Sequence, residues 1–83
     1  MKEEIISIIR AINDMEDSVQ ISADLDLIEG DLLDSMGIVQ LVMELQNKFN
    51  ISEIDPEDII PENFSTVTQI EELVGRYQKA EAK

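Results

Sequence analysis

Three stretches of the chain place hydrophobic residues at helical spacing. From Lys2 to about Met15, isoleucine recurs at positions 5, 8, 9 and 12, which is the spacing of one helix face. A second such stretch runs from Met36 to about Phe49, and a third begins after Thr66. Strand-like alternation of polar and apolar residues is missing throughout the sequence. The pattern therefore predicts an all-α protein.

The segments between these stretches predict a long loop and one short helix. Residues 16–34 lose the helical period and gather Asp, Ser and Gly around Gly30. Large aliphatic residues within this segment argue against disorder and need cover from the core; they are Leu25, Leu27, Ile28, Leu32 and Leu33. Asp55 followed by Pro56 is typical of a capped helix start, and Pro61 limits that helix to about one turn.

We expect one domain over residues 1–83, built as a small four-helix bundle with one short helix and a long first loop. Thr66 and Gln69 have the spacing of a capping box at the start of the last helix. The ordered core is predicted to span residues 2–77, with residues 78–83 as a frayed tail. A chain of this length supports a single modest hydrophobic core.

The helix expected from Met36 carries two apolar stripes. Plotted at about 100° per residue, five positions fall in one sector and form the core face: Ile38, Leu41, Val42, Leu45 and Phe49. Met36, Val39 and Met43 form a second stripe about 140° away on the same wheel. That stripe is either packed under a loop, so that the helix is buried on two sides, or left open for a partner. Two methionines suit a surface that adapts to several shapes.

Ser35 stands at the N-terminal end of this helix, where two interpretations are open. A serine at a helix boundary is most often an N-cap whose oxygen accepts a hydrogen bond from an early backbone N–H. A serine that begins an open apolar stripe is also a candidate attachment site for a chemical group. The position of Ser35 alone favours the N-cap interpretation. The apolar stripe that follows favours the interpretation as an attachment site.

Composition narrows the class of function. The formal net charge is −13, from 19 acidic and 6 basic residues, which argues against binding to nucleic acid or anionic membranes and favours basic partners. The chain has no cysteine and no histidine, so thiolate nucleophiles, ordinary zinc sites and the commonest general base are missing. We therefore expect a protein that is not an enzyme.

No apolar run approaches the ~20 residues of a membrane span, and the first residues lack the pattern of a signal peptide, so a cytoplasmic location is expected.

The residues around Ser35 carry a resemblance to a known family. The run Leu33-Asp34-Ser35-Met36 is similar to the attachment motif of the phosphopantetheine-binding acyl carrier proteins, of the stand-alone kind. The similarity extends through the isoleucine-rich first helix, the long loop, the segment LVMELQNKF, the short helix after DPEDI, and PENFSTVTQI. The chain also resembles D-alanyl carrier proteins, through LLDS followed by glycine two residues beyond the serine.

The resemblance implies a function, a cofactor and partners. Ser35 would bear 4′-phosphopantetheine, delivered from coenzyme A by a phosphopantetheinyl transferase, and the thiol of this arm would carry an acyl group as a thioester. Asp34, Met36, Val39 and Met43 occupy positions that the family uses to contact partner enzymes. Those partners would be the transferase, an acyl- or aminoacyl-loading ligase, and downstream synthases or transferases with basic surfaces. The protein itself is expected to be a monomer. It is expected to act in fatty acid or secondary metabolite biosynthesis.

One departure from the family pattern leaves the cargo open. Carriers of fatty acid synthesis usually have a strongly acidic second helix, whereas this chain has Gly37, Gln40, Gln46 and Asn47 there. A general acyl carrier ranks first and a D-alanyl or other aminoacyl carrier second. An unmodified acidic helical adaptor that docks through the second stripe is an alternative of another class. Calcium sensing fails because the acidic residues after Asp24 lack the spacing of a calcium-binding loop, and no metal site is expected.

Overall fold

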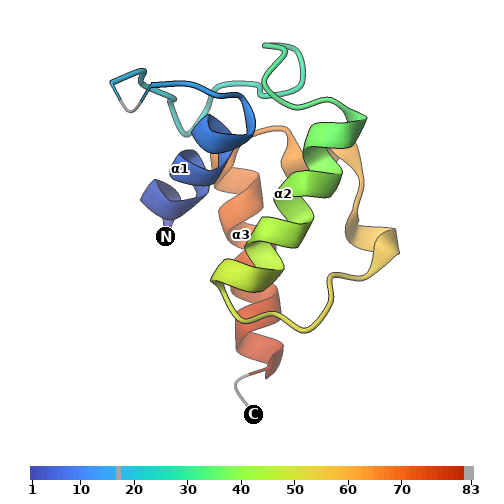
Figure 1. Cartoon of the computed structure of the whole chain (residues 1–83). Helices are drawn as coiled ribbons and strands as arrows, with labels where there is room; N and C mark the ends of the chain where they lie inside the picture. Colours follow the sequence, from blue (N-terminus) through green and yellow to red (C-terminus); the bar gives the residue numbers. More distant parts are fainter. Residues whose placement is uncertain (17, 82–83) are drawn as a thin grey trace.

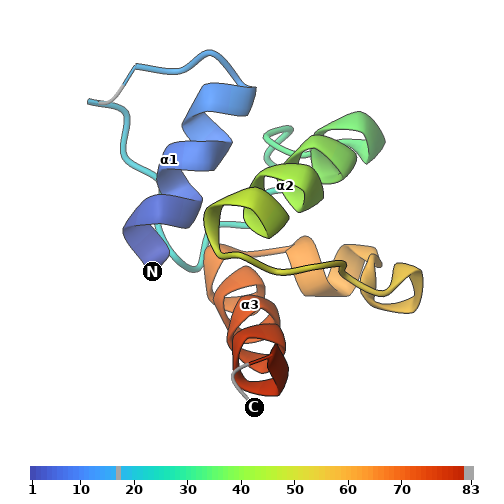
Figure 2. The same ribbon diagram turned by 60° about the horizontal axis from the view of Figure 1, so that its bottom comes forward.

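The described residues fold into three α-helices and two single-turn 3₁₀-helices around one core. A computed structural model describes residues 1–16 and 18–81. The order of elements along the chain is α1 (Lys2–Ile12), α2 (Ser35–Lys48), η1 (Pro56–Asp58), η2 (Pro61–Phe64) and α3 (Val67–Glu81). α1 and α2 both pack against the rest of the bundle, and α3 crosses beneath them (Figures 1 and 2). Strands are absent from the described residues, so the all-α prediction is confirmed.

The expected fourth helix takes the form of two 3₁₀ turns. Asp55 caps η1 by accepting a hydrogen bond from the Glu57 N–H at 2.9 Å, and Pro56 holds the first helical position. Pro61 then begins η2. Because Pro61 has no N–H to donate to the turn before it, η1 cannot continue into a longer α-helix. The expected count of four helices is therefore not confirmed: the described residues form three α-helices, with a short 3₁₀ segment in place of the fourth.

α1 ends three residues earlier than its sequence pattern suggested. Asp14 adopts a left-handed backbone conformation with φ of 56°, which stops the helix. The Asn13 side-chain amide donates to the carbonyl oxygens of Ile9 at 2.9 Å and Leu32 at 2.8 Å. The end of α1 is thus tied to the long loop just before α2.

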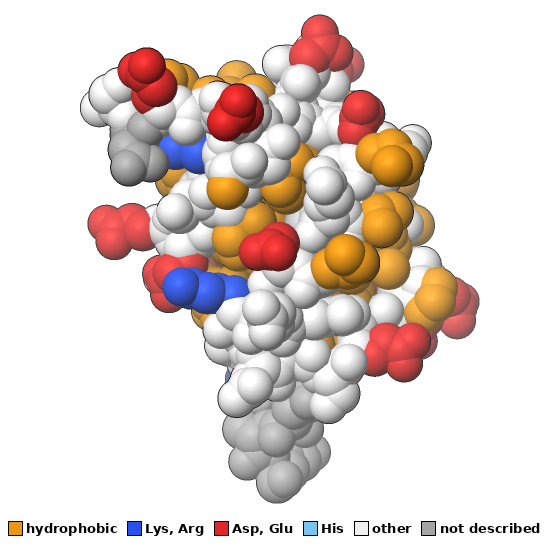
Figure 3. Space-filling model, in the orientation of Figure 1, with side chains coloured by type: hydrophobic (Ala, Val, Ile, Leu, Met, Phe, Trp, Pro, Cys, Tyr) orange, Lys and Arg blue, Asp and Glu red, His pale blue; other side chains and the backbone are white. Residues whose placement is uncertain are grey.

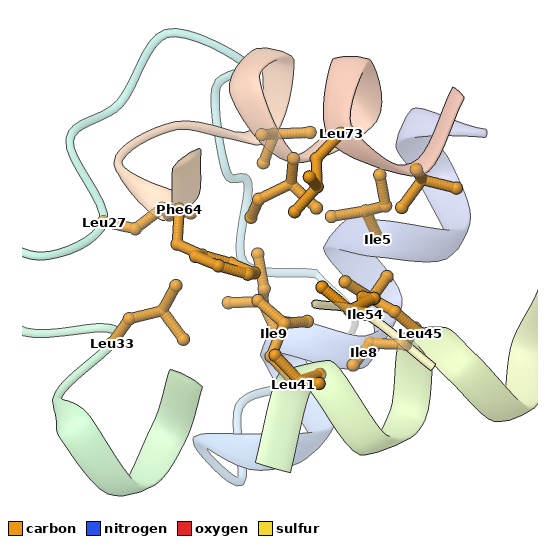
Figure 4. Close-up of a cluster of buried hydrophobic side chains, with 14 of the residues drawn as sticks. Ile5, Ile8, Ile9, Leu27, Leu33, Leu41, Leu45, Ile54, Phe64 and Leu73 are labelled. Carbon is orange, nitrogen blue, oxygen red and sulfur yellow. The ribbon is translucent and has the colours of Figure 1, made fainter. Parts of the chain in front are cut away.

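The core gathers side chains from the three α-helices, from η2 and from the connecting loops, whereas η1 contributes no buried residue. Ile5, Ile9, Leu41 and Leu45 of α1 and α2 are fully buried in one cluster with Phe64 of η2, whose ring lies beside Ile9 (Figure 4). Leu27 and Leu33 of the long loop are buried with them, as the sequence predicted. Leu25 is the exception, since 39% of it is exposed.

The last helix begins as expected. The Thr66 hydroxyl accepts a hydrogen bond from the Gln69 N–H at 3.1 Å, which is the Thr half of the predicted capping box. α3 is helical as far as Glu81. The predicted frayed tail, residues 78–83, extends to residues 82 and 83, which lie outside the described part of the chain. Within that part, no helix has the length and apolar character needed to cross a membrane.

Candidate functional site

Asp34, and not Ser35, caps α2. The Asp34 backbone is extended, and its carboxylate accepts a hydrogen bond from the Gly37 N–H at 2.7 Å. Ser35 is the first residue of the helix and is exposed. The cap interpretation of Ser35 is therefore wrong: Asp34 satisfies the early N–H group that a serine cap would have served. The Ser35 hydroxyl is left at the surface, on the first turn of a helix.

Gly37 permits this close capping contact. A Cβ atom at Gly37 would lie 3.2 Å from Asp34 Oδ1 and 3.5 Å from Leu33 Cδ2, and such contacts leave little room for a side chain. From the sequence, Gly37 stood out as a missing acid and as the glycine two residues beyond Ser35, and its part in the cap was not predicted. The signal that was available is the spacing of Asp34 and Gly37, which is that of an N-cap and the third residue of its helix.

The loop before Ser35 is fixed by hydrogen bonds around Leu27. The Leu27 N–H donates to the Ser65 carbonyl at 2.7 Å, and the Leu27 carbonyl accepts from the N–H groups of Leu32 and Leu33 at 2.8 and 2.9 Å. Within this turn, a Cβ at Gly30 would lie 2.8 Å from the Asp26 carbonyl oxygen, so glycine allows the close approach. Leu33 is buried two residues before Ser35. These hydrogen bonds and the buried Leu33 fix the loop, which places Ser35 at the surface.

The second stripe of α2 is open. Met36, Val39 and Met43 are 74%, 55% and 58% exposed, so the alternative of a helix buried on two sides is wrong. Exposed hydrophobic side chains gather along α2 and the segment beside it on the face that Figure 3 shows. Ile38 and Phe49, expected on the core face, are only partly buried. Three large apolar side chains that begin one residue after Ser35 form a surface of the kind that binds partners.

The segment after α2 is held against α3 by Tyr77. The Tyr77 hydroxyl donates to Asp58 Oδ2 at 2.5 Å and accepts from the Asp55 N–H at 2.9 Å. Burial, followed by the hydrogen bond to Asp58, raises the pKa of Tyr77 above its ordinary value of 10.0. The sequence could not predict this role of Tyr77, because no local pattern links it to a residue 19 positions away.

The charged side chains of the segments around the site are acidic. Neither residues 11–47 nor residues 49–75 contain a lysine or arginine, so α2 before Lys48, the long loop and both 3₁₀-helices contribute only acidic charges. Groups of three or more acidic side chains placed to hold a metal ion were not found among the described residues. The site can therefore attract a basic partner.

A small helical domain with an exposed serine beside an open apolar stripe is compatible with the carrier type that the sequence resembles. The curated relatives are carrier proteins of this type. The chain is 37% identical over 70 residues to the D-alanyl carrier protein of Lactococcus lactis subsp. cremoris strain MG1363, a match that covers 84% of this chain and 86% of that protein. The D-alanyl carrier protein of Leuconostoc mesenteroides subsp. mesenteroides is 37% identical over 79 residues, with coverage of 90% and 97%. That of Streptococcus sanguinis strain SK36 is 36% identical over 80 residues, with coverage of 96% and 98%.

The chain belongs to the family of the D-alanyl carrier proteins, within the acyl-carrier type that the sequence resembles. Carriers of this type are not catalytic and serve as substrates of other enzymes. No family model matches the chain, and no solved structure gives a significant match to it.

Proposed function

We propose that this protein carries D-alanine as a thioester on a 4′-phosphopantetheine arm attached to Ser35. One observation carries the attachment: Asp34 caps α2, so the exposed Ser35 hydroxyl is available for a covalent bond. The names of the relatives support the cargo. A general acyl carrier, ranked first from the sequence, is the second candidate.

The residues present fit the arm. The positive end of the 14-residue helix α2 lies at Ser35, and helix N-termini stabilise bound phosphate groups. The arm supplies a thiol, which this chain lacks since it has no cysteine. In the attachment reaction, the Ser35 oxygen forms a new bond to the phosphorus nearest the pantetheine of coenzyme A. The bond from that phosphorus to the rest of the nucleotide breaks, and the hydroxyl proton passes to the transferase.

The chain's own residues bring Ser35 to its partners. Asp34 fixes the first turn of α2, and the rigid turn around Leu27 fixes the loop before it. Met36, Val39 and Met43 then offer apolar contacts, and the acidic surface accelerates encounter with basic enzymes. The exposure of Asp34, Met36, Val39 and Met43, and their positions on α2 or at its cap, support these roles.

The test of attachment is the intact mass of the protein after incubation with coenzyme A, magnesium and a broad-specificity phosphopantetheinyl transferase. We expect one added phosphopantetheine on the wild type, none on Ser35→Ala, and one on Ser7→Ala, a control at another exposed helical serine. An unmodified wild type, with a known carrier modified in parallel, would contradict the proposal and favour the unmodified adaptor.

The cargo is tested on the pantetheinylated protein. Incubation with ATP, D-alanine and a D-alanine–carrier ligase should add one alanyl group, and a fatty acid with an acyl-carrier synthetase should add little. Hydroxylamine should release the alanyl group, because thioesters are cleaved by this reagent. Preferential loading with the fatty acid would instead support the general acyl carrier.

A further inference from the structure

The segment that follows α2 lies beside the open stripe. We call residues Ile54–Ile60 the strap; it contains η1. The strap runs along α2 on the side opposite α1 in both ribbon views (Figures 1 and 2). Its last residue, Ile60, is 39% exposed.

Two side chains from different helices hold the strap in place. Gln46 of α2 accepts a hydrogen bond from the Ile54 N–H at 2.8 Å through its Oε1 atom. Tyr77 of α3 bonds to both Asp58 and Asp55. The strap is therefore fastened at its first residue to α2 and at its middle to α3.

Gln46 also fixes which edge of α2 the strap faces. It lies three residues after Met43 and seven after Val39, so all three share one flank of the helix. Because Gln46 bonds to Ile54, the strap begins at the flank that carries Val39 and Met43. The exposed stripe and the strap are thus neighbouring parts of one surface.

The strap carries the carboxylates that α2 lacks. The first turn of α2 contains no acidic residue, and Glu44 is its one acid. The strap contains Asp55, Glu57 and Asp58, and residues 49–75 contain no basic residue. Asp55 and Asp58 are occupied by hydrogen bonds to the strap and to Tyr77, whereas Glu57 is exposed. An apolar stripe with an acidic edge is complementary to an apolar patch edged by lysine or arginine.

We propose that Gln46 and Tyr77 are positioning residues for docking: they hold the strap so that Glu57 and Ile60 complete the surface that binds the phosphopantetheinyl transferase. This inference rests on the proposed attachment at Ser35. The matching surface of the transferase is apolar at its centre, where it meets Met36, Val39 and Met43, and basic along the edge that faces the strap.

The experiment measures kcat and KM for modification of the apo protein by the transferase, with coenzyme A saturating. Glu57→Lys should raise KM about tenfold and leave kcat near the wild-type value, because a reversed charge at the edge of an interface weakens encounter. Glu72→Lys is the matched control: it makes the same charge change at an exposed position on α3, and it should alter KM less than about twofold.

The positioning role of Gln46 and Tyr77 is tested with variants that keep or lose their hydrogen bonds to the strap. Gln46→Leu removes the acceptor for Ile54 and should raise KM, whereas Gln46→Glu keeps an oxygen acceptor and should leave KM at or below the wild-type value. Tyr77→Phe removes both hydrogen bonds of the hydroxyl and should raise KM at least about threefold, with kcat unchanged. Circular dichroism at the assay temperature confirms that each variant is folded.

The outcomes separate the two proposals. If the wild type is not modified at all, attachment at Ser35 fails and the inference fails with it. If the wild type is modified but Glu57→Lys and Glu72→Lys have the same KM, the strap is not part of the docking surface, and the proposed function stands. If Glu57→Lys raises KM while Gln46→Leu and Tyr77→Phe do not, the positioning role is wrong.

Discussion

At the scale of single residues, Asp34 caps α2 and Ser35 keeps an exposed hydroxyl, and these separate roles decide what the site can do. Both residues are common at helix N-termini, so the sequence could not say which one caps α2. The structure assigns the hydrogen bond to Asp34 because its backbone is extended and its carboxylate reaches the Gly37 N–H at 2.7 Å. One residue supports the helix, and its neighbour is free to be modified.

This division predicts opposite effects of two alanine substitutions. Asp34→Ala should lower the free energy of unfolding by about 1 kcal/mol, the usual contribution of a capping side chain. Ser35→Ala should change it by less than about 0.5 kcal/mol, as expected for an exposed position outside any cap. Urea denaturation followed by circular dichroism measures both values. A larger loss for Ser35→Ala than for Asp34→Ala would contradict the assignment of the cap.

At the scale of elements, the sequence predicted what depends on local spacing. The three α-helices, the Thr66 cap and the grouping of Met36, Val39 and Met43 into one stripe all follow from periodicity or short-range pairing. That this stripe is exposed comes from the structure, since the sequence left it open. The position of the strap does not, because it depends on hydrogen bonds between residues far apart in the chain. Gln46 and Ile54 are 8 positions apart, and Tyr77 and Asp58 are 19 apart. Neither pair has a signature in a single sequence.

The hydrogen bonds of Tyr77 that link η1 to α3 should stabilise the fold less at alkaline pH. Burial and the hydrogen bond to Asp58 raise the pKa of Tyr77 in the folded protein. A raised pKa means that the folded state prefers the protonated hydroxyl, so its stabilising effect is complete below pH 10 and is lost as pH rises through the folded pKa. The difference in unfolding free energy between wild type and Tyr77→Phe should therefore be constant below pH 10 and shrink above it.

Tyr77 is the one tyrosine in the chain, and tryptophan is absent, so the tyrosinate absorbance reports this group alone. Its titration midpoint in the folded protein should lie above the midpoint measured in urea. Equal midpoints would show that neither burial nor Asp58 favours the protonated hydroxyl.

At the scale of the whole molecule, the excess of negative charge opposes folding. A net charge of −13 on 83 residues produces repulsion that is stronger in the compact state than in the unfolded chain. The ion pairs of Met1 with Glu4 and of Lys2 with Glu71 lie at the surface, partly exposed to solvent, and offset little of it. Screening should therefore stabilise the fold.

We expect the melting temperature to rise by a few degrees between about 0.02 and 0.5 M sodium chloride, since the Debye length falls well below the size of the protein over this range. Thermal unfolding followed by circular dichroism measures the shift. Choline chloride at the same ionic strength should produce the same rise. A rise with sodium but not with choline would point to specific cation binding in place of screening.

The two ends of the molecule also differ in a way that matters for handling it. The longest dimension of the protein is 37 Å, and the N-terminal end of α2 and the C-terminal end of α3 lie at opposite ends of the fold (Figure 1). A tag, dye or solid support joined to the C-terminus would therefore leave the serine-bearing end facing the solution. Immobilised in this orientation, the protein could be used as bait to isolate the enzymes that act on it.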